Sequence, residues 1–242
     1  MDLEGRAALI TGASRGLGLS IARALARQRA AVSCVARAGE ELDRAVAALV
    51  AGGARAIAAP ADVTRAAEVE RAVETTVASL GRLDIVVLNA GTWQGAPITE
   101  TPEATWDLLL DLNLKGAFLT LKYALPHLIR RRSGTVVGIG SLGGAVGQPN
   151  AAAYAASKWG LRGLLESVAL EVKPHRVRVS IVAPHNINSA GRAIAPDSED
   201  RSHAIEPDEI ASLVAHICAA PDHVSIGNVS IWPIAAGIHS ES

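Results

Sequence analysis

The chain has 242 residues, a length that suits one large domain with a substantial buried core. Hydrophobic residues make up 49% of it, and its formal net charge is −1. This balance argues against a nucleic-acid-binding protein, which would normally carry a strongly basic surface. A local basic run, Arg130–Arg132, fits the end of a helix, where the helix dipole favours positive charge.

Cysteine usage and the first residues indicate a cytoplasmic protein. Cys34 and Cys218 lie far apart, and neither belongs to a C-x-x-C pair, so nothing supports a disulfide framework or a zinc site. Residues 1–5 are charged and lead straight into an apolar run, unlike a signal peptide. No apolar stretch reaches the roughly 20 residues that a membrane-spanning helix needs. We therefore expect a soluble protein with reduced thiols, no metal and no membrane partner.

Short apolar runs alternate with amphipathic segments along the whole chain. The runs have the near-continuous hydrophobicity of strands buried on both faces of a parallel sheet; they are Ala7–Ile10, Ala31–Ala36, Ala54–Ala58, Leu83–Leu88, Thr135–Ile139, Val177–Val182 and Asn228–Trp232. The helical segments are Gly16–Arg29, Glu40–Ala51, Ala66–Leu80, Pro102–Arg131, Ala152–Lys173 and Pro207–Ala219, with Pro102 and Pro207 suited to first turns. The alternation predicts one α/β domain: a doubly wound, Rossmann-type parallel sheet of seven strands with helices on both faces.

One interval, residues 185–206, breaks this rhythm. It is polar and contains Gly191, Pro196 and a charged cluster at residues 197–201. It follows the sixth strand, and ligands of open α/β sheets bind beyond the carboxyl ends of the strands. The sequence therefore predicts a substrate loop or lid here, with a plain surface loop as the alternative.

A glycine-rich segment follows the first strand and opens the first helix. It reads Thr11-Gly12-Ala13-Ser14-Arg15-Gly16-Leu17-Gly18. Glycines allow a tight turn and close approach to a pyrophosphate, and a helix N-terminus offers N–H groups to phosphates. The spacing differs from the G-x-G-x-x-G of the standard dinucleotide-binding motif. By itself the segment fits either a nucleotide site or a tight turn.

The end of the second strand bears on the choice of cofactor. NAD-binding folds place an acidic residue there, which binds the ribose hydroxyls and repels a 2′-phosphate. Here the strand ends in Val35-Ala36-Arg37, and no carboxylate follows until Glu40. Arg15 and Arg37 could together clamp a 2′-phosphate, because guanidinium groups match phosphate geometry. This predicts NADP(H) rather than NAD(H); the alternative is two solvated surface arginines.

A tyrosine and a lysine open the long fifth helical segment. In Tyr154-Ala155-Ala156-Ser157-Lys158 the phenol and the ammonium share one helix face, because they are four positions apart. A nearby ammonium is expected to lower the pKa of Tyr154 from about 10, which would suit acid–base chemistry near neutral pH. Ser141 ends the fifth strand, at the sheet edge where ligands bind. The Y-x-x-x-K spacing alone occurs by chance in many helices.

Together these motifs resemble the short-chain dehydrogenase/reductase family, in its single-domain branch of about this length. The resemblance covers essentially the whole chain. Besides the glycine segment, Ser141, Tyr154 and Lys158, it rests on Asp62-Val63, Asn89-Ala90-Gly91, Asn113 and Pro184. The order and spacing of all of them together are highly specific, although Ser141, Asn113 or Asn89 taken singly could be a strand cap, a helix hydrogen bonder or a turn residue.

The resemblance implies an oxidoreductase that transfers hydride between a nicotinamide and a ketone or secondary alcohol. Tyr154 would give the proton to the carbonyl oxygen, and Lys158 would lower its pKa and bind the nicotinamide ribose. Ser141 would hold the substrate oxygen, and Asn113 would position a water that links Lys158 to solvent. Asp62 and Val63 would contact adenine. The implied cofactor-binding residues are Gly12, Ser14, Arg15, Gly16, Leu17, Gly18, Arg37, Asp62, Val63, Asn89, Ala90, Gly91, Tyr154, Lys158, Pro184, Ile187 and Ser189.

The chain departs from the family pattern after the sixth strand. Many relatives have Pro-Gly there and a small hydroxyl residue four positions beyond the glycine, whereas this chain reads Pro184-His185-Asn186-Ile187-Asn188-Ser189. His185 replaces the glycine, Ser189 takes the hydroxyl position, and the backbone of Ile187 would contact the carboxamide. The imidazole would narrow the space beside the nicotinamide or add a polar contact, with a positional or packing role favoured over a catalytic base.

The substrate and the assembly are less well defined. The residues expected to line the substrate pocket are Trp93, Gln94, Leu142, Gln148 and His185. Trp93 would either pack against an apolar or aromatic carbonyl compound or be a partly buried scaffold residue. The resemblance also implies a homodimer or homotetramer, formed through the helices at residues 102–131 and 152–173.

Two other functions stay open. A 3-oxoacyl-thioester reductase of the fatty-acid type would need a basic docking face for an acidic carrier protein, and Arg130–Arg132 is its only candidate. A catalytically silent, NADP-sensing regulator would fit the unusual His185, but the intact Ser141, Tyr154 and Lys158 argue against it.

Overall fold

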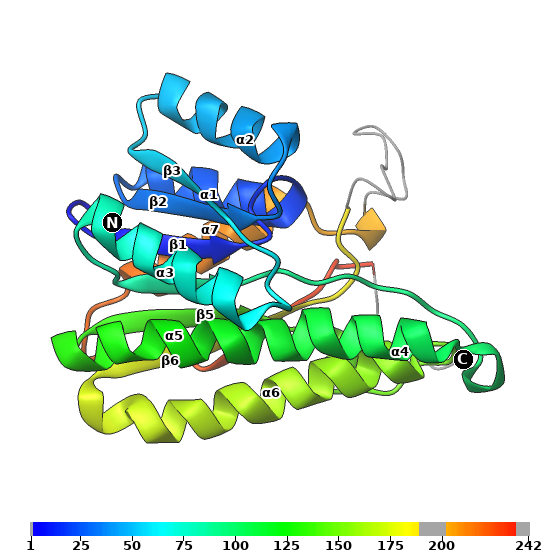
Figure 1. Ribbon diagram of the computed structural model, residues 1–242. Helices are drawn as coiled ribbons and strands as arrows, with labels where there is room; N and C mark the ends of the chain where they lie inside the picture. The colour runs from blue at the N-terminus through cyan, green and yellow to red at the C-terminus, as the bar shows by residue number, and fades with distance from the viewer. Residues whose placement is uncertain (1, 189–201, 236–242) are drawn as a thin grey trace.

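A single parallel sheet forms the centre of the molecule, as Figure 1 shows for a computed structural model that describes residues 2–188 and 202–235. Its order is β3-β2-β1-β4-β5-β6-β7. The strands are β1 (Ala7–Thr11), β2 (Ala31–Ala36), β3 (Ala56–Pro60), β4 (Ile85–Leu88), β5 (Gly134–Ile139), β6 (Val177–Pro184) and β7 (Asn228–Ile231). All six neighbouring pairs are parallel, so the predicted doubly wound, seven-stranded fold is confirmed.

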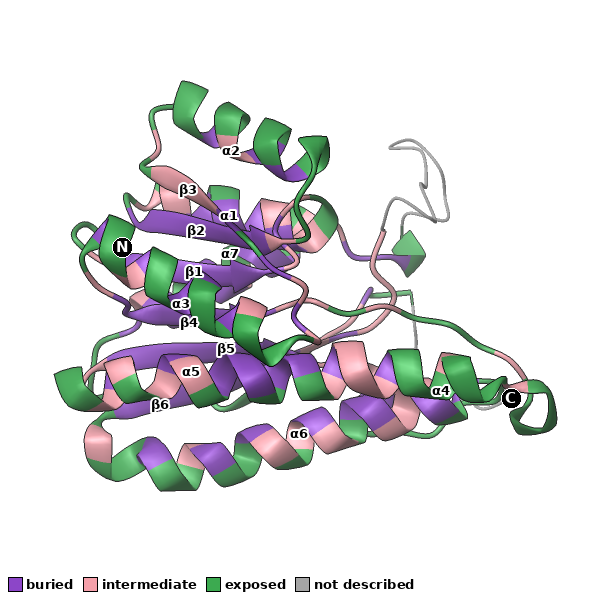
Figure 2. Ribbon diagram, viewed as in Figure 1, coloured by how far each residue is buried: buried purple, intermediate pink, exposed green. Residues whose placement is uncertain are grey.

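Helices cover both faces of this sheet. They are α1 (Gly16–Arg27), α2 (Glu40–Ala51), α3 (Ala66–Leu80), α4 (Glu103–Leu110), α5 (Gly116–Arg131), α6 (Ala152–Val172) and α7 (Pro207–Ala219). Buried residues of α1, α2 and α7 form one core cluster with the sheet, and those of α3, α5 and α6 form the other. Figure 2 shows the consequence: the central strands between them are buried, while each helix exposes its outer side.

The two cores explain why the strand sequences are apolar throughout. Successive side chains of a strand point to opposite faces, so a strand covered on both sides needs apolar residues at every position. The residues that face α1 and α7 include Ile10, Val87, Val137 and Val182. Their neighbours Leu9, Val86, Val136 and Ile181 face α3, α5 and α6.

The strand order reverses between β1 and β4. The chain runs outward from β1 through β2 to β3, then returns to the other side of β1 and continues from β4 to β7. In open α/β sheets this reversal leaves a crevice beyond the carboxyl ends of the two central strands, where ligands bind. The fold therefore places the site at the ends of β1 and β4.

Several element boundaries differ from the sequence prediction. The expected single helix over residues 102–131 is two helices joined by a π-helical turn, Asp111–Lys115, and Pro102 lies just before α4 rather than inside its first turn. Pro207, in contrast, begins α7 as expected. The third strand ends at Pro60 and the sixth at Pro184, two residues later than predicted in both cases. Apolar patterning does not mark the residue at which a strand stops pairing.

The interval predicted as a substrate loop is described only at its ends. Ile187 forms a parallel bridge with Ile205, and backbone hydrogen bonds of 2.9 and 2.8 Å join Asn188 N–H to Ile205 and Ile205 N–H to Asn186. Residues 189–201, which include Ser189, lie outside the described residues. Elsewhere, Cys34 and Cys218 are free and buried, and burial raises the pKa of each thiol to about 12. Within the described ranges, no helix has the length and apolar character to cross a membrane.

Replacing Gly18 by alanine tests the packing of α1 against the sheet. A Cβ at Gly18 would lie 2.1 Å from the carbonyl oxygen of Gly12, so part of the backbone would have to move. We expect Gly18→Ala to lower the free energy of unfolding by about 2 kcal/mol, measured by urea denaturation. Gly163→Ala is the control, because nothing lies within 4 Å of that position in α6. It should raise stability by up to about 1 kcal/mol through helix propensity. Equal stability of the two variants would contradict the packing argument.

Candidate active site

Two central strand ends are held together by a set of hydrogen bonds. Thr11 Oγ1, at the end of β1, accepts hydrogen bonds of 3.0 Å from the backbone N–H groups of Asn89 and Ala90. The Asn89 side-chain amide donates in return to the carbonyl oxygens of Thr11 (2.9 Å) and Gly12 (3.3 Å). Thr11 Oγ1 also donates to Val87 in β4. Asn89 therefore fixes the glycine segment to the end of β4.

The glycine segment has the shape that a dinucleotide's pyrophosphate requires. Gly12 has φ +68° and Gly16 has φ +53°, left-handed conformations that favour glycine. Gly18 lies so close to Gly12 that no side chain fits between them, which brings the start of α1 against the strand end. Among the described residues, no side chain caps the N-terminus of α1. These features fit a phosphate-binding helix N-terminus.

The expected adenosine end holds Ser14, Arg15, Arg37 and Asp62. Arg15 and Arg37 are exposed. Burial, the largest single influence, raises the pKa of Asp62, but hydrogen bonds from Thr64 and the charges of Arg65 and Arg37 together lower it below its usual value. Arg37 is thus close enough to Asp62 to stabilise its carboxylate. The two groups that the sequence predicts for the ribose phosphate and the adenine lie near each other.

A carboxylate that the sequence analysis missed is also present there. Glu41, in the first turn of α2, accepts a hydrogen bond of 3.0 Å from Ser14 Oγ. Its other oxygen lies 3.8 Å from Nη1 of Arg15. The acidic residue expected in NAD-binding folds lies at the end of the second strand, whereas Glu41 reaches Arg15 from the helix that follows.

The predicted reacting groups meet beyond the end of β5. Tyr154 lies in the first turn of α6, and its phenol is close enough to Ser141 for that side chain to lower the pKa of the phenol. Ser141 Oγ also accepts a hydrogen bond of 3.2 Å from the backbone N–H of Gly143. One turn further along α6, Lys158 Nζ lies 5.8 Å from the centre of the Tyr154 ring and donates a 2.9 Å hydrogen bond to the carbonyl oxygen of Ile139. The structure brings the three side chains together, as their sequence spacing predicts.

The expected pKa of Tyr154 is wrong. Burial raises the pKa of the phenol above its ordinary value, and the hydrogen bond from Ser141 offsets only part of that effect. Burial also lowers the pKa of Lys158, to about 8. Desolvation disfavours the charged form of each group, and the ammonium is bonded to Ile139 rather than to the phenol. At neutral pH the tyrosine is therefore a neutral phenol, able to donate a proton.

Asn113 lies on the π-helical turn and hydrogen-bonds to two segments next to the site. It is only 1% exposed. Its amide group donates to the carbonyl oxygen of Thr92 and to Ser157 Oγ, both at 3.0 Å, and its Oδ1 accepts from Thr92 N–H at 2.8 Å. Ser157 in turn donates to the carbonyl oxygen of Tyr154. Asn113 thus ties the segment after β4 to the first turn of α6, and its predicted water-positioning role stays a prediction.

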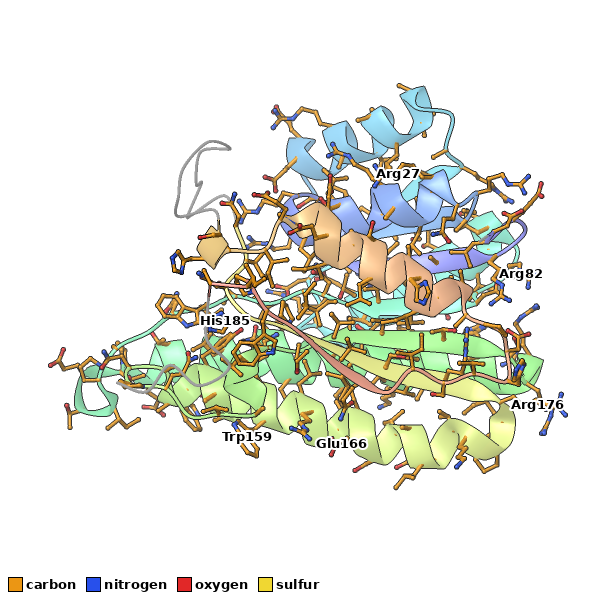
Figure 3. The ribbon with its side chains drawn as sticks, turned by 180° about the vertical axis from the view of Figure 1, so that it is seen from behind. Arg27, Arg82, Trp159, Glu166, Arg176 and His185 are labelled. Carbon is orange, nitrogen blue, oxygen red and sulfur yellow. The ribbon has the colours of Figure 1, made fainter. Side chains whose placement is uncertain are left out.

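His185 forms an aromatic pair that the sequence did not reveal. Its ring stacks on Trp232, with centroids 5.0 Å apart and planes 12° from parallel. The strand register explains the pairing: Pro184 is opposite Ile231, and the next residue of each strand follows. His185 N–H also donates to the carbonyl oxygen of Ile231 at 3.0 Å. Figure 3 shows His185 near the carboxyl end of the sheet.

The other predicted site residues surround this edge to different degrees. Val63 is buried against Gly116, where a Cβ would come within 2.8 Å of it. Trp93 is 62% exposed and thus contributes little to the core, which disfavours its alternative as a scaffold residue. The half-buried members are Leu17, Ala90, Leu142 and Ile187, and the exposed ones are Gly91, Gln94 and Gln148.

Comparison with known proteins gives one family. Residues 6–199 match the family model described as short chain dehydrogenase. A 3-oxoacyl-acyl-carrier-protein reductase of Staphylococcus aureus is 38% identical over 180 residues, covering 74% of this chain and 73% of that protein. The (-)-trans-carveol dehydrogenase of Rhodococcus erythropolis is 34% identical over 256 residues, covering 96% and 92%.

Solved structures agree in fold. A metagenomic short-chain oxidoreductase in complex with NADP is 38% identical, with a TM-score of 0.83 and coverage of 96% of this chain and 98% of that one. An alcohol dehydrogenase from Thermococcus sibiricus, complexed with 5-hydroxy-NADP, is 29% identical, with a TM-score of 0.89 and coverage of 97% and 99%. Both similar structures hold a nicotinamide cofactor, which supports the fit of the glycine segment to such a group.

The lowered pKa of Lys158 predicts a pH dependence of stability. In the unfolded chain this lysine keeps its ordinary pKa of 10.5, against about 8 in the folded protein. The unfolded state therefore binds more protons between these values, and the contribution of Lys158 to the free energy of unfolding rises with pH there. Urea denaturation at about pH 7.5 and about pH 9.5 should show this rise, relative to Lys158→Met, which lacks the titrating group. The same pH slope in both proteins would contradict the buried-ammonium assignment.

Proposed function

Because the chain belongs to the short-chain dehydrogenase family and is an oxidoreductase, we propose that it is an NADP(H)-dependent carbonyl reductase or alcohol dehydrogenase. Its substrate would be a ketone or the corresponding secondary alcohol. The observation that carries the proposal is the convergence of Ser141, Tyr154 and Lys158 at the carboxyl end of β5.

The residues of the site suit proton transfer to a carbonyl oxygen. A bound nicotinamide cofactor supplies or accepts the hydride. Ser141 Oγ, oriented by Gly143 N–H, holds the substrate oxygen beside the Tyr154 hydroxyl, which donates its proton during reduction. Lys158, an ammonium below a pKa of about 8, provides positive charge beside the phenolate that remains.

Two groups of residues support NADP(H) as the cofactor. The glycine segment and the N-terminus of α1 fit a pyrophosphate. Arg15 and Arg37 are exposed cations at the end where a 2′-phosphate would lie. Similar proteins of known structure are complexed with NADP or 5-hydroxy-NADP, which favours the same choice here.

A 3-oxoacyl-thioester reductase is the second candidate, favoured by the similarity to the S. aureus enzyme. The basic run that would dock an acidic carrier protein gives it little support. Arg130 and Arg131 are the last residues of α5. This helix begins next to the turn that carries Asn113, and its 16 residues span about 24 Å, so the two arginines lie far from that turn. Arg131 Nε lies 3.5 Å from the buried Asp84, and Arg132 donates to the carbonyl oxygen of Pro174. The run thus lies near the amino end of β5, whereas Tyr154 lies beyond its carboxyl end.

Tyr154→Phe tests the proton donor. The change removes the hydroxyl group but keeps the ring, so we expect turnover to fall by about 1,000-fold or more while NADPH binding stays within about two-fold. NADPH and NADH oxidation should be followed with simple ketones and with acetoacetyl thioesters. Retained turnover in Tyr154→Phe would overturn the mechanism. Faster turnover of acetoacetyl thioesters than of simple ketones by the unaltered chain would favour the 3-oxoacyl-thioester reductase.

The raised pKa of Tyr154 predicts how the two directions respond to pH. Reduction needs the neutral phenol, which is the form present at and below neutral pH. Oxidation needs the phenolate, so its rate should increase as pH rises into the alkaline range. A pH profile of kcat for each direction would check this, and an oxidation rate that falls above neutral pH would contradict it.

We further propose that the chain self-associates, through the outer sides of α4, α5 and α6. These helices expose large apolar side chains: Trp106, Leu108, Phe118, Trp159 and Leu170. Figure 3 shows Trp159 on the outer surface of α6. Exposed apolar groups concentrated on neighbouring helices are typical of protein–protein interfaces.

The double variant Phe118→Glu/Trp159→Glu should reduce the mass measured by light scattering to that of a single chain, because it places two charges on this surface. Val50→Glu is the control, since Val50 is similarly exposed on α2. A single-chain mass for the unaltered protein would rule out the assembly.

A further inference from the structure

One carboxylate contacts two adjacent residues that are predicted to bind the cofactor, Ser14 and Arg15, just before α1. Glu41 Oε2 accepts a 3.0 Å hydrogen bond from Ser14 Oγ, and Glu41 Oε1 lies 3.8 Å from Arg15 Nη1. Ser14 and Arg15 are adjacent and directly precede α1. Glu41 therefore stands where an anionic ligand group would otherwise satisfy the same hydroxyl and guanidinium.

The position of Glu41 is favourable for a carboxylate but leaves it exchangeable. It lies in the first turn of α2, where the positive end of the helix dipole stabilises negative charge. The side chains of Arg15 and Glu41 are 72% and 51% exposed. Ion pairs this accessible to water are weak, so a better anion can displace the carboxylate.

Arg37 differs from Arg15 in this respect. In the described part of the chain, no carboxylate oxygen lies within ion-pair distance of Arg37, although its charge lowers the pKa of Asp62. Of the two cations assigned to the 2′-phosphate, one is thus already paired and the other is not.

We propose that Glu41 is a specificity-determining residue, which competes with the 2′-phosphate of NADP(H) for Arg15 and Ser14. The inference rests on the proposed function. A phosphate carries more negative charge than a carboxylate and displaces it, but the lost pairing reduces the net gain in affinity. NAD(H) has a hydroxyl at the same position and leaves the Glu41–Arg15 pair intact. Glu41 therefore narrows the difference in affinity between the two cofactors.

Glu41→Gln tests the competition directly. Glutamine keeps the length of the side chain and an acceptor for Ser14, but it removes the charge that pairs with Arg15. We expect the Kd for NADPH to fall by about five-fold and the Kd for NADH to change by less than about two-fold. Both are measured by fluorescence titration without substrate, so the result does not depend on turnover.

Glu40→Gln is the matched control. It removes the same charge one position earlier in the same helical turn. Among the described residues, the only hydrogen bond that joins Glu40 to a side chain is the one that its backbone oxygen accepts from Arg44. Both Kd values should stay within about two-fold of the unaltered chain. A five-fold gain in NADPH affinity in this variant would mean that any loss of negative charge near the site has the same effect, and it would overturn the inference.

The Arg15→Ala background separates competition from simple repulsion. If Glu41 acts by occupying Arg15, Glu41→Gln should change the Kd for NADPH by less than about two-fold once Arg15 is absent. The inference would be overturned if Glu41→Gln still lowered the Kd for NADPH five-fold in the Arg15→Ala background. It would also be overturned if Glu41→Gln alone bound NADPH more weakly than the unaltered chain, or selectively lost affinity for NADH. Failure of the unaltered chain to bind NADPH would instead overturn the proposed function.

Discussion

The junction between β1 and β4 is the constraint on which the arrangement of the site depends. These are the two central strands at which the sheet order reverses, and Thr11 and Asn89 satisfy each other's polar groups across it. Such groups are costly to leave unpaired inside a protein, so these hydrogen bonds hold the carboxyl ends of β1 and β4 side by side. The absence of a side chain at Gly18 then allows α1 to approach the same point. The glycine segment and the end of β4 are therefore positioned by one set of contacts.

Burial and exposure divide the site into two regions with different electrostatics. Around Tyr154 and Lys158, desolvation sets the protonation of both groups: it keeps the phenol neutral and weakens the hold of the ammonium on its proton. Around Arg15 and Glu41, water screens the charges, and partners can exchange. The desolvated region around Tyr154 and Lys158 suits the proposed proton transfer. The solvent-exposed region around Arg15 and Glu41 suits the proposed discrimination between cofactors that differ by one phosphate.

The turn that carries Tyr154 is held in place by hydrogen bonds from Asn113 and Ser157. Asn113 joins Thr92 to Ser157, and Ser157 bonds to the carbonyl oxygen of Tyr154. The π-helical turn inserts one extra residue in the coil at Asn113, which is consistent with the frequent occurrence of such turns at functional sites. His185 and Trp232 form a stacked aromatic pair just beyond the ends of β6 and β7. Asn113 and Ser157 thus hold the backbone of the turn that carries Tyr154.

Much of the fold followed from local patterns. Apolar runs identified all seven strands, and the Y-x-x-x-K spacing correctly placed Tyr154 and Lys158 on one face of α6. The interruption of the helix at Asp111–Lys115 was missed, because the apolar pattern continues across it and a π turn leaves no mark in composition. The prediction for the pKa of Tyr154 is wrong because sequence spacing shows that a lysine is near, but not that Lys158 is buried and that desolvation acts on both groups.

The sequence by itself determined the fold class, the glycine turn and the shared helix face of Tyr154 and Lys158, because each depends on residues close together in the chain or on periodicity. Only the tertiary structure decided that Glu41 reaches Ser14 and Arg15, that Trp232 stacks on His185, and that Asn113 braces α6. These contacts join segments that are far apart in the sequence. Their distances and their burial are set by how the helices and strands pack, and no local pattern records that.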